Sequence, residues 1–229
     1  MRHFPEQAVR FCKGIFAMKV LSDEQIVQFA EQGYLVVSGL IAKEVVDSAR
    51  SELELELIEG KTAFFGTNVA NSCYNQAICS AAAILGDDPA IALEFPVKSA
   101  FAINTLPTEG KWVWPNPHID HAIEKDGHKV FPRPFRLASM LYLSDISVGG
   151  GGTVVWPGSH RQIERLALSD PEHYEMMWVL NRELAKAGLA SPVELTAKAG
   201  DILFYHYLCA HAGSKNTTSQ PRLALNKKW

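Results

Sequence analysis

The sequence has few cysteines, and no two of them stand in a metal-binding or redox spacing. The 229-residue chain contains four cysteines, none in a Cys-x-x-Cys pair, so a zinc or thioredoxin-type site is a poor interpretation. Four scattered cysteines in a chain of this length do not suggest a small secreted disulfide scaffold either. We therefore expect reduced thiols and a cytoplasmic protein. The four are Cys12, Cys73, Cys79 and Cys209.

Long apolar runs and an excess of positive charge are also absent. No apolar stretch approaches the roughly 18 residues of a membrane-spanning helix. The net charge is −3 and the pI about 6.2, which provides no basic surface for nucleic acid. Apolar residues make up 47% of the chain, enough for a substantial core and too many for global disorder. We expect neither membrane nor nucleic acid as a partner.

The chain is predicted to form one domain after a short extension. Residues 1–19 contain four Lys or Arg residues against one acid and no serine, which argues against an organelle-targeting segment. We expect this stretch to be a poorly ordered extension. Residues 20–229 show no repeat, low-complexity tract or linker, so they are predicted to be a single domain.

The N-terminal half predicts mainly helices. Ser22 and Gln25 form a capping box, followed by an apolar stripe with helical spacing. Further helices are predicted over residues 42–59 and 77–85.

The C-terminal half predicts mainly strands, with one inserted helix. Residues 135–143 alternate between two faces, as a half-buried strand does. A second capping box, Ser169-x-x-Glu172, predicts a helix that ends at Gly188. The remaining strands are predicted over residues 34–37, 95–106, 153–156, 193–195, 201–208 and 222–226.

Two histidines and one aspartate form the strongest chemical signal. His118 and Asp120 are two residues apart, so in a strand both side chains lie on one face. His211 follows an apolar run far downstream. Two histidines and a carboxylate that leave coordination positions open form the facial triad of non-haem Fe(II) oxygenases. Arg222 stands eleven residues after His211, and its guanidinium suits the far carboxylate of a dicarboxylate cosubstrate.

The ordered set of motifs is more specific than any one of them. Besides the residues above, the sequence carries Pro157-Gly158-Ser159-His160 after a glycine-rich turn, and Gly200-Asp201 before His211. Over roughly residues 20–229 it resembles the phytanoyl-CoA dioxygenase-like family of Fe(II)/2-oxoglutarate oxygenases. That resemblance implies a mainly β fold with flanking helices, a cupin-like jelly roll or double-stranded β-helix. Composition and spacing alone do not distinguish this fold from another sandwich. Relatives often have a lysine where residues 104–107 read Asn-Thr-Leu-Pro.

The resemblance also implies the cofactors and the reaction. His118, Asp120 and His211 would bind Fe(II), 2-oxoglutarate and O2 would take the open positions, and Arg222 would pair with the distal carboxylate. The enzyme would hydroxylate a small molecule and release succinate and CO2. Asp120 favours hydroxylation because halogenase relatives lack the carboxylate. Two alternatives remain open: a cupin-like metalloenzyme that does not use 2-oxoglutarate, which Arg222 argues against, and a non-catalytic ligand-binding jelly roll, which the intact triad argues against.

Other residues near these motifs have weaker interpretations. His206 is the main rival of His211 as the third ligand, and it could instead line the substrate cavity. His160 is interpreted as structural. Arg133 and Arg136 belong to, or directly follow, a loop with a local excess of positive charge after Asp120. We expect a solvated loop whose charges have no specific partner; the alternative hypothesis is that one or two of these cations bind a carboxylate or phosphate of a small polar substrate.

Overall fold

The structure, a computed structural model, describes residues 20–58, 64–66 and 68–229. The extension predicted over residues 1–19 and the predicted end of the second helix at Glu59 and Gly60 lie outside the described residues. The helices are α1 (Asp23–Gln32), α2 (Lys43–Ile58), α3 (Asn68–Ser72), α4 (Gln76–Gly86), η2 (Pro89–Leu93), η3 (Glu124–Asp126), α5 (Ser159–Ser169), α6 (Met177–Arg182) and η4 (Leu184–Ala187). The strands are β1 (Tyr34–Val37), β2 (Phe64–Gly66), β3 (Phe101–Ile103), β4 (Leu137–Tyr142), β5 (Thr153–Val155), β6 (Val193–Glu194), β7 (Ile202–His206), β8 (His211–Gly213) and β9 (Ala224–Lys228).

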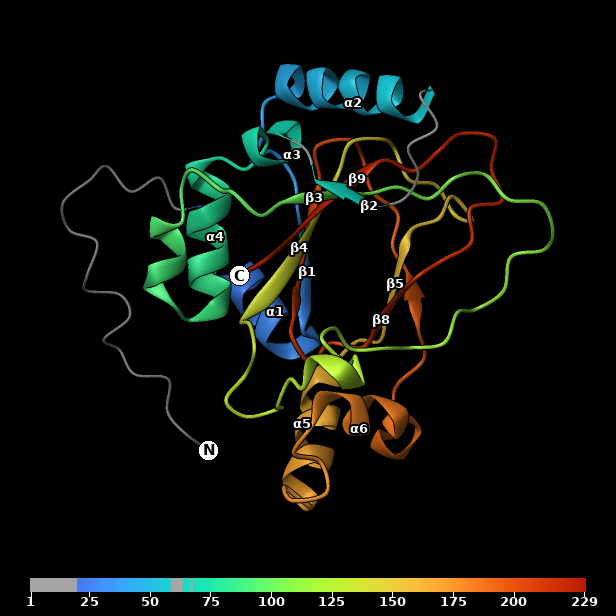
Figure 1. The fold of residues 1–229 in the computed structure, drawn as a ribbon. Helices are drawn as coiled ribbons and strands as arrows, with labels where there is room; N and C mark the ends of the chain where they lie inside the picture. The colour runs from blue at the N-terminus through green and yellow to red at the C-terminus, as the bar shows by residue number, and fades with distance from the viewer. Residues whose placement is uncertain (1–19, 59–63, 67) are drawn as a thin grey trace.

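Two antiparallel sheets face each other. The larger sheet has the order β1-β7-β4-β9-β3-β2, and the smaller has the order β6-β5-β8. Helices α1 and α4 lie on the side of the larger sheet that faces away from β5 and β8, while α5 and α6 lie at one end of the two sheets (Figure 1). This is the mainly β architecture with flanking helices that the sequence predicts.

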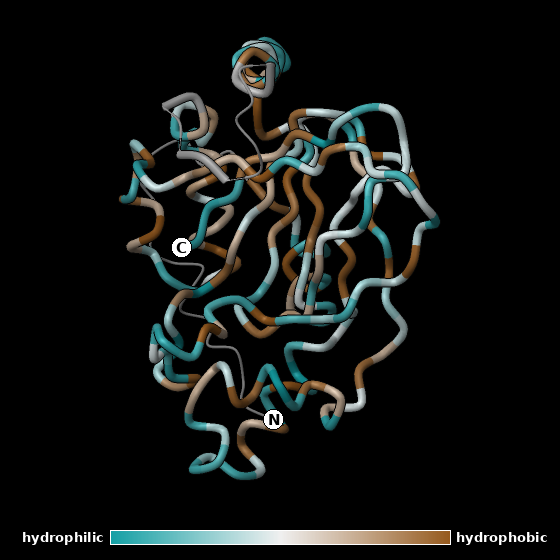
Figure 2. The backbone as a smooth tube through the Cα atoms, turned by 45° about the vertical axis from the view of Figure 1, so that its right-hand side comes forward, coloured by the Kyte–Doolittle hydropathy of each residue, from teal (hydrophilic) through white to brown (hydrophobic). Residues whose placement is uncertain are grey.

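The larger sheet is buried on both faces, and alternate residues serve two different cores. In β4, Leu137 and Leu141 pack against the helices, whereas Ala138, Met140 and Tyr142 pack between the sheets. The predicted alternation of this strand is therefore confirmed, although every residue in it is buried. The central strands are accordingly hydrophobic along much of their length, and the outer loops are more polar (Figure 2).

The first helix follows the predicted capping pattern. The backbone N–H of Gln25 donates to Ser22 Oγ, and the backbone N–H of Ser22 donates to Gln25 Oε1. Gly33 ends the helix with a φ of 77°, a conformation that other residues rarely adopt. A Cβ at this position would lie 2.3 Å from His160 Nδ1. Gly33 therefore ends α1 and also leaves room for the motif histidine.

The prediction of one helix over residues 169–188 was wrong. Ser169 ends α5 instead of capping a new helix, and its hydroxyl donates to Leu166 O at 2.7 Å. Asp170 caps the following turn by accepting from His173 N. The buried stripe of Ile163 and Ala167 shows why a helix forms earlier: its apolar period outweighs a Ser-x-x-Glu pattern that arises easily by chance. Gly188 does terminate η4, as predicted.

Within the described ranges, no helix is both long enough and apolar enough to cross a membrane.

Candidate functional site

The fold brings His118, Asp120 and His211 together although they come from distant parts of the chain. His118 and His211 form an antiparallel bridge. The backbone N–H of each donates to the backbone O of the other, with N to O distances of 3.0 Å. The ligand atoms of the three side chains all lie within 4.8 Å of one another. Among the described residues this is the one group of His, Cys, Asp and Glu side chains that has metal-binding geometry.

His118 and Asp120 share a side of the backbone without forming the expected strand. Only His118 makes a bridge, and Asp120 lies in a turn. Ile119 points away from the triad and is 1% exposed, while its backbone N–H donates to Asn181 Oδ1 at 2.8 Å. One bridge and one side-chain hydrogen bond therefore suffice to keep the backbone extended and the alternation intact.

The serine of the Pro-Gly-Ser-His motif contacts the two residues that precede His211 and so helps to position it. Ser159 Oγ accepts a hydrogen bond from Ala210 N at 2.9 Å and donates to Cys209 Sγ at 3.8 Å. His211 Nδ1 lies 3.0 Å from Cys209 O, a contact in which Nδ1–H donates and Nε2 keeps a lone pair for a ligand. The thiol of Cys209 is buried, and burial raises its pKa to about 12, which fits a packing role.

Asp120 is surrounded by groups that stabilise its charge. Burial favours the neutral acid, but His211 and Lys228 outweigh burial, so the pKa of Asp120 is lowered. Lys228 Nζ lies 3.2 Å from Asp120 Oδ1. The other oxygen, Oδ2, lies 3.8 Å from His211 Nε2 and accepts from the Tyr205 hydroxyl at 3.3 Å. Burial, and then the neighbouring His211, lower the pKa of His118 to about 4. The His118 imidazole beside Asp120 and His211 is therefore neutral at pH 7.

The triad opens into a cavity of about 400 Å³. His118 and Asp120 are the two triad residues that line it, together with residues of the loop after Asp120, Asn181 and Lys228. Ring centroids of His121 and His128 lie 4.4 Å apart in this wall. The first part of the positively charged loop that follows Asp120 therefore lies against the triad.

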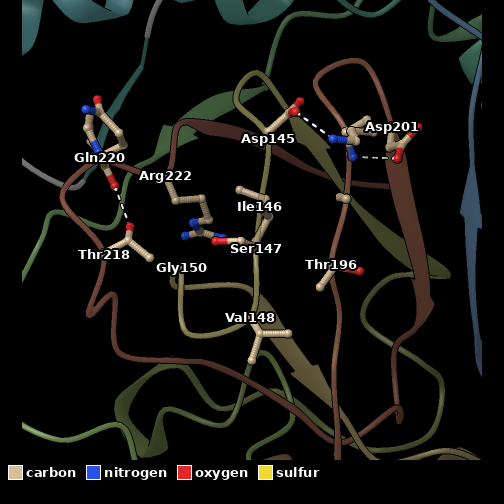
Figure 3. A pocket seen from close by; sticks show the side chains of 13 residues that line it. Asp145, Ile146, Ser147, Val148, Gly150, Thr196, Asp201, Thr218, Gln220 and Arg222 are labelled. Atoms are coloured by element: carbon tan, nitrogen blue, oxygen red, sulfur yellow. Dashed lines mark hydrogen bonds and ion pairs between the residues drawn. The ribbon is translucent and has the colours of Figure 1, made fainter.

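Arg222 lines a second, larger cavity of about 760 Å³. The residue is 3% exposed, and Figure 3 shows its guanidinium extending toward Ser147 in the middle of the cavity. Nη2 donates to Thr105 Oγ1 at 2.7 Å and to Ile103 O at 3.4 Å, but Nε has no hydrogen-bond partner. No acid forms an ion pair with Arg222 in the described part of the chain. Burial lowers the pKa of Arg222, opposed by Tyr142 and Tyr205.

The two cavities share no lining residue. Tyr205 interacts with one residue of each, Asp120 in the smaller and Arg222 in the larger. Its hydroxyl contacts Asp120 and accepts from Asn226 Nδ2 at 3.3 Å, and it is close enough to Arg222 to affect the pKa of the guanidinium. Thr105, which stands in the segment where relatives often carry a lysine, contacts Arg222 directly. The side-chain amide of the neighbouring Asn104 is buried without a hydrogen-bond partner among the described residues.

The other candidate residues lie apart from the triad. His206 packs against His160, with ring centroids 5.2 Å apart, and its Nδ1 accepts from Leu208 N. His160 Nε2 contacts Ala30 O at 3.2 Å. Arg136 pairs with Asp88 at 3.0 Å. His206, Arg133 and Arg136 line neither of the two cavities described above.

Sequence reasoning missed four residues that contact the triad or hold it in place: Ser159 as a support for His211, Asn181 as a support for the backbone at Ile119, Tyr205 and Lys228. For Lys228 a signal was present. Positions 222, 224, 226 and 228 share one face of an extended segment, so Lys228 has to face the same side as Arg222. The tyrosine and the serine have no comparable signal, because their contacts join separate elements.

The sheet arrangement and the triad together define a metal-dependent oxygenase of the jelly-roll class. The sequence profile of the phytanoyl-CoA dioxygenase (PhyH) family matches residues 29–224. The chain belongs to this family, and with it to the Fe(II)- and 2-oxoglutarate-dependent dioxygenases.

Solved structures with the same fold include enzymes of this class. The carbocyclase SnoK from nogalamycin biosynthesis is 20% identical, with a TM-score of 0.63 over 90% of this chain and 82% of that one. EctD from S. alaskensis, solved with 2-oxoglutarate and 5-hydroxyectoine, is 19% identical, with a TM-score of 0.61 over 90% and 75%. HygX from Streptomyces hygroscopicus, solved with nickel and 2-oxoglutarate, is 19% identical, with a TM-score of 0.51 over 90% and 85%. At these identities the likeness supports the jelly-roll fold. A comparison with curated proteins found no match.

Proposed function

We propose that His118, Asp120 and His211 hold Fe(II), that Arg222 binds the distal carboxylate of 2-oxoglutarate, and that the enzyme hydroxylates a small molecule. The observation that carries this proposal is Arg222: a guanidinium with 3% exposure and no acidic partner among the described residues. A buried charge without a partner is costly, so its presence is best explained by an anion that binds there.

The triad fits Fe(II) by the chemistry of its donors. Two imidazoles and one carboxylate are a donor set that Fe(II) accepts while keeping positions open for other ligands. Each donor is oriented by a further contact: the backbone bridge holds His118, Cys209 O holds His211, and the Tyr205 hydroxyl holds Asp120. Such supporting contacts maintain ligand geometry in metal sites.

The chain also fits 2-oxoglutarate at the Arg222 end. The guanidinium is fixed by two hydrogen bonds to Ile103 and Thr105, and its free Nε–H is available to an incoming carboxylate oxygen. A charge-assisted pair with a carboxylate would satisfy this donor and offset the charge at once. Arginine suits this task better than lysine because its donors form a planar fork.

When bound, Fe(II) with 2-oxoglutarate and O2 supplies the oxidant, and the cosubstrate is converted to succinate and CO2. The residues of this chain have the tasks of positioning and exclusion. Tyr205 holds Asp120, and the two apolar cores leave the side chains of Asp120 and His211 17% and 9% exposed. The loop 121–128 shields the substrate side.

The substrate is proposed to be a small molecule. The cavity at the triad measures about 400 Å³, a size that holds a small ligand and not a folded partner. The solved enzymes SnoN and EctD were crystallised with nogalamycin RO and 5-hydroxyectoine. A role of Arg133 or Arg136 in binding an anionic substrate stays a prediction; Arg136 already has an acidic partner in Asp88.

The metal assignment is tested by Mn(II) binding, measured by electron paramagnetic resonance. Alanine at His118, Asp120 or His211 should weaken Mn(II) binding by at least about 100-fold, because each loss removes a ligand. His206→Ala is the matched control and should leave Mn(II) affinity unchanged. If His206→Ala abolishes binding and His211→Ala does not, the third ligand is wrongly assigned.

The cosubstrate is tested on the same proteins without oxygen. Adding 2-oxoglutarate to the Fe(II)-loaded wild type should change the absorbance spectrum, and the triad variants should not respond. Succinate release across a panel of small molecules then identifies the substrate. An Fe(II)-loaded wild type that releases no succinate and shows no spectral response to 2-oxoglutarate would refute the proposed function.

A further inference from the structure

The extended segment that leads into β9 and β9 itself carry two cations on one face, Arg222 before the strand and Lys228 at its end. Register pairs Ala224 with Tyr142, Asn226 with Met140 and Lys228 with Ala138, and these β4 partners pack between the two sheets. Paired residues share a face of the sheet. Arg222, Ala224, Asn226 and Lys228 therefore face the space between the sheets. Six residues separate the two cations, about 20 Å along the strand.

The two cations belong to different cavities. Arg222 lines the larger one and Lys228 the smaller one, beside the triad. Among the residues that line the smaller cavity, Lys228 is the single Lys or Arg. Asp126 also lines it, at an exposed position in η3, and forms no ion pair with Lys228. The remaining polar groups in this wall are His121, His128 and Asn181.

Lys228 is held at the triad by a single acid. Its Nζ lies 3.2 Å from Asp120 Oδ1, the side chain is 28% exposed, and the Phe135 ring centroid lies 5.5 Å from Nζ. No second acid forms an ion pair with Lys228 in the described ranges. Lys227 on the opposite face also pairs with one acid, Glu94, and lies over Trp229, but its acid is not one of the proposed metal ligands.

A divalent metal held by Asp120 would weaken the ion pair between Asp120 and Lys228. The metal takes up the charge of the carboxylate and repels the ammonium group, since like charges a few ångströms apart repel strongly in a partly buried site. The charges of Fe(II), Asp120, 2-oxoglutarate and Arg222 cancel one another. Lys228 is then left without a counter-charge, beside the cavity that is open to a substrate.

We propose that Lys228 binds a carboxylate or phosphate group of the substrate in the smaller cavity, and that it leaves Asp120 to do so once the metal is bound. This inference rests on the proposed function and specifies the substrate class of the same site. It assigns Arg222 and Lys228 matched tasks on one strand: the first holds the cosubstrate, the second holds the substrate.

The test uses Mn(II)-loaded protein saturated with 2-oxoglutarate, with inorganic phosphate and acetate as separate probes. Mn(II) speeds the nuclear relaxation of a probe bound close to it, so phosphorus NMR follows phosphate and proton NMR follows the acetate methyl group. The wild type should show saturable relaxation for at least one probe. Lys228→Gln should weaken that binding by about tenfold or more, because a charge-assisted pair is lost. The stronger probe identifies carboxylate or phosphate as the group bound.

Two matched variants separate charge from structure. Lys228→Arg keeps the charge and should retain probe binding. Lys129→Gln removes a cation of the same loop region that pairs with Glu175 away from the cavity, and should behave like wild type. Mn(II) affinity should stay equal or rise in Lys228→Gln, because a positive charge near the metal is removed.

Several results overturn the inference without touching the proposed function. One is a wild type that binds Mn(II) through the triad but relaxes neither probe. Another is Lys228→Gln with unchanged probe binding. A third is Lys228→Gln with weakened Mn(II) binding, which would show that the lysine only holds Asp120 in place. Loss of the triad dependence of Mn(II) binding would instead count against the proposed function itself.

Discussion

The two faces of the larger sheet differ in the residues that they bury, although the same strands form both. The face toward α1, α2 and α4 is apolar almost throughout, with Leu141, Phe204 and Leu225 at or near zero exposure. The face toward the smaller sheet carries the polar groups, among them Tyr205 and Arg222. Because successive residues of a strand point to opposite faces, each strand contributes to both. The helix face stabilises the fold, while the inner face holds the chemistry.

The inner face contains buried polar atoms that lower the stability of the fold. On the inner face, Tyr142 donates to Thr153 Oγ1 at 2.9 Å and Tyr205 donates to Asp120, so these buried hydroxyls are satisfied. In contrast, Arg222 Nε and Asn226 Oδ1 are buried without a hydrogen-bond partner among the described residues. Unpaired polar atoms destabilise a core, and in proteins they concentrate at sites that bind ligands. The comparison therefore predicts opposite outcomes for substitutions on the two faces.

Arg222→Met should produce the largest effect. Affinity for 2-oxoglutarate should fall by about 2 to 5 kcal/mol, because a buried carboxylate would lose its charge-assisted partner. The metal-free variant should nevertheless become more stable, by about 1 kcal/mol or more, since a buried cation without an acid is replaced by an apolar chain. Mn(II) affinity should not change.

Isothermal titration with 2-oxoglutarate and chemical unfolding of the metal-free protein measure the two effects of Arg222→Met. Arg165→Met, the same replacement at an exposed arginine, serves as the control. An Arg222→Met protein that keeps full 2-oxoglutarate affinity would refute the role of this residue. A metal-free Arg222→Met protein that is less stable than the metal-free wild type would show that the buried Arg222 charge does not destabilise the fold.

Leu141→Ala tests the opposite face. Leu141 is fully buried against the helices, so its truncation should reduce the free energy of unfolding by about 2 to 5 kcal/mol. Mn(II) and 2-oxoglutarate affinities of the folded variant should match wild type, because no inward-facing group moves. Denaturant unfolding measures the loss, and Leu168→Ala at 57% exposure is the control. A large change in Mn(II) affinity would show that the two faces are not independent.

The smallest effect concerns pH and His160, which lies between α1 and α5. Burial, and then Arg161, lower the pKa of His160 to about 4. A histidine whose folded-state pKa lies below its unfolded value contributes full stability above about pH 6.5 and loses it as pH falls toward the folded value. We expect this residue to account for about 2 kcal/mol of lost stability between pH 7 and pH 5.

Denaturant unfolding across this range should show that His160→Gln has a shallower pH dependence than wild type. His173→Gln, an exposed histidine, should keep the wild-type slope. His206, whose pKa burial and then His160 lower to about 3, should retain part of the acid sensitivity in the variant. Identical slopes in wild type and His160→Gln would contradict the assignment.

Much of this protein is determined by local pattern in the sequence. The Ser22 capping box, the alternation in β4 and the side-by-side placement of His118 and Asp120 all follow from helical and strand geometry. The same geometry places Arg222 and Lys228 on one face. The false helix start at Ser169 marks the limit of such patterns, because a short capping signal is weaker than the buried stripe of α5.

The contacts between charged groups depend on the packing of elements that are distant in the sequence. Lys228 reaches Asp120 because β9 pairs with β4 in one particular register, whereas Arg136 turns to Asp88 and His206 packs against His160. Ser159 supports His211 by accepting a hydrogen bond from Ala210 N, 51 residues along the chain. These contacts depend on which strands pair and how the two sheets stack, and residues distant in sequence carry no local signal of that. The sequence by itself determines the faces on which residues lie; the packing of the sheets determines which partners they find there.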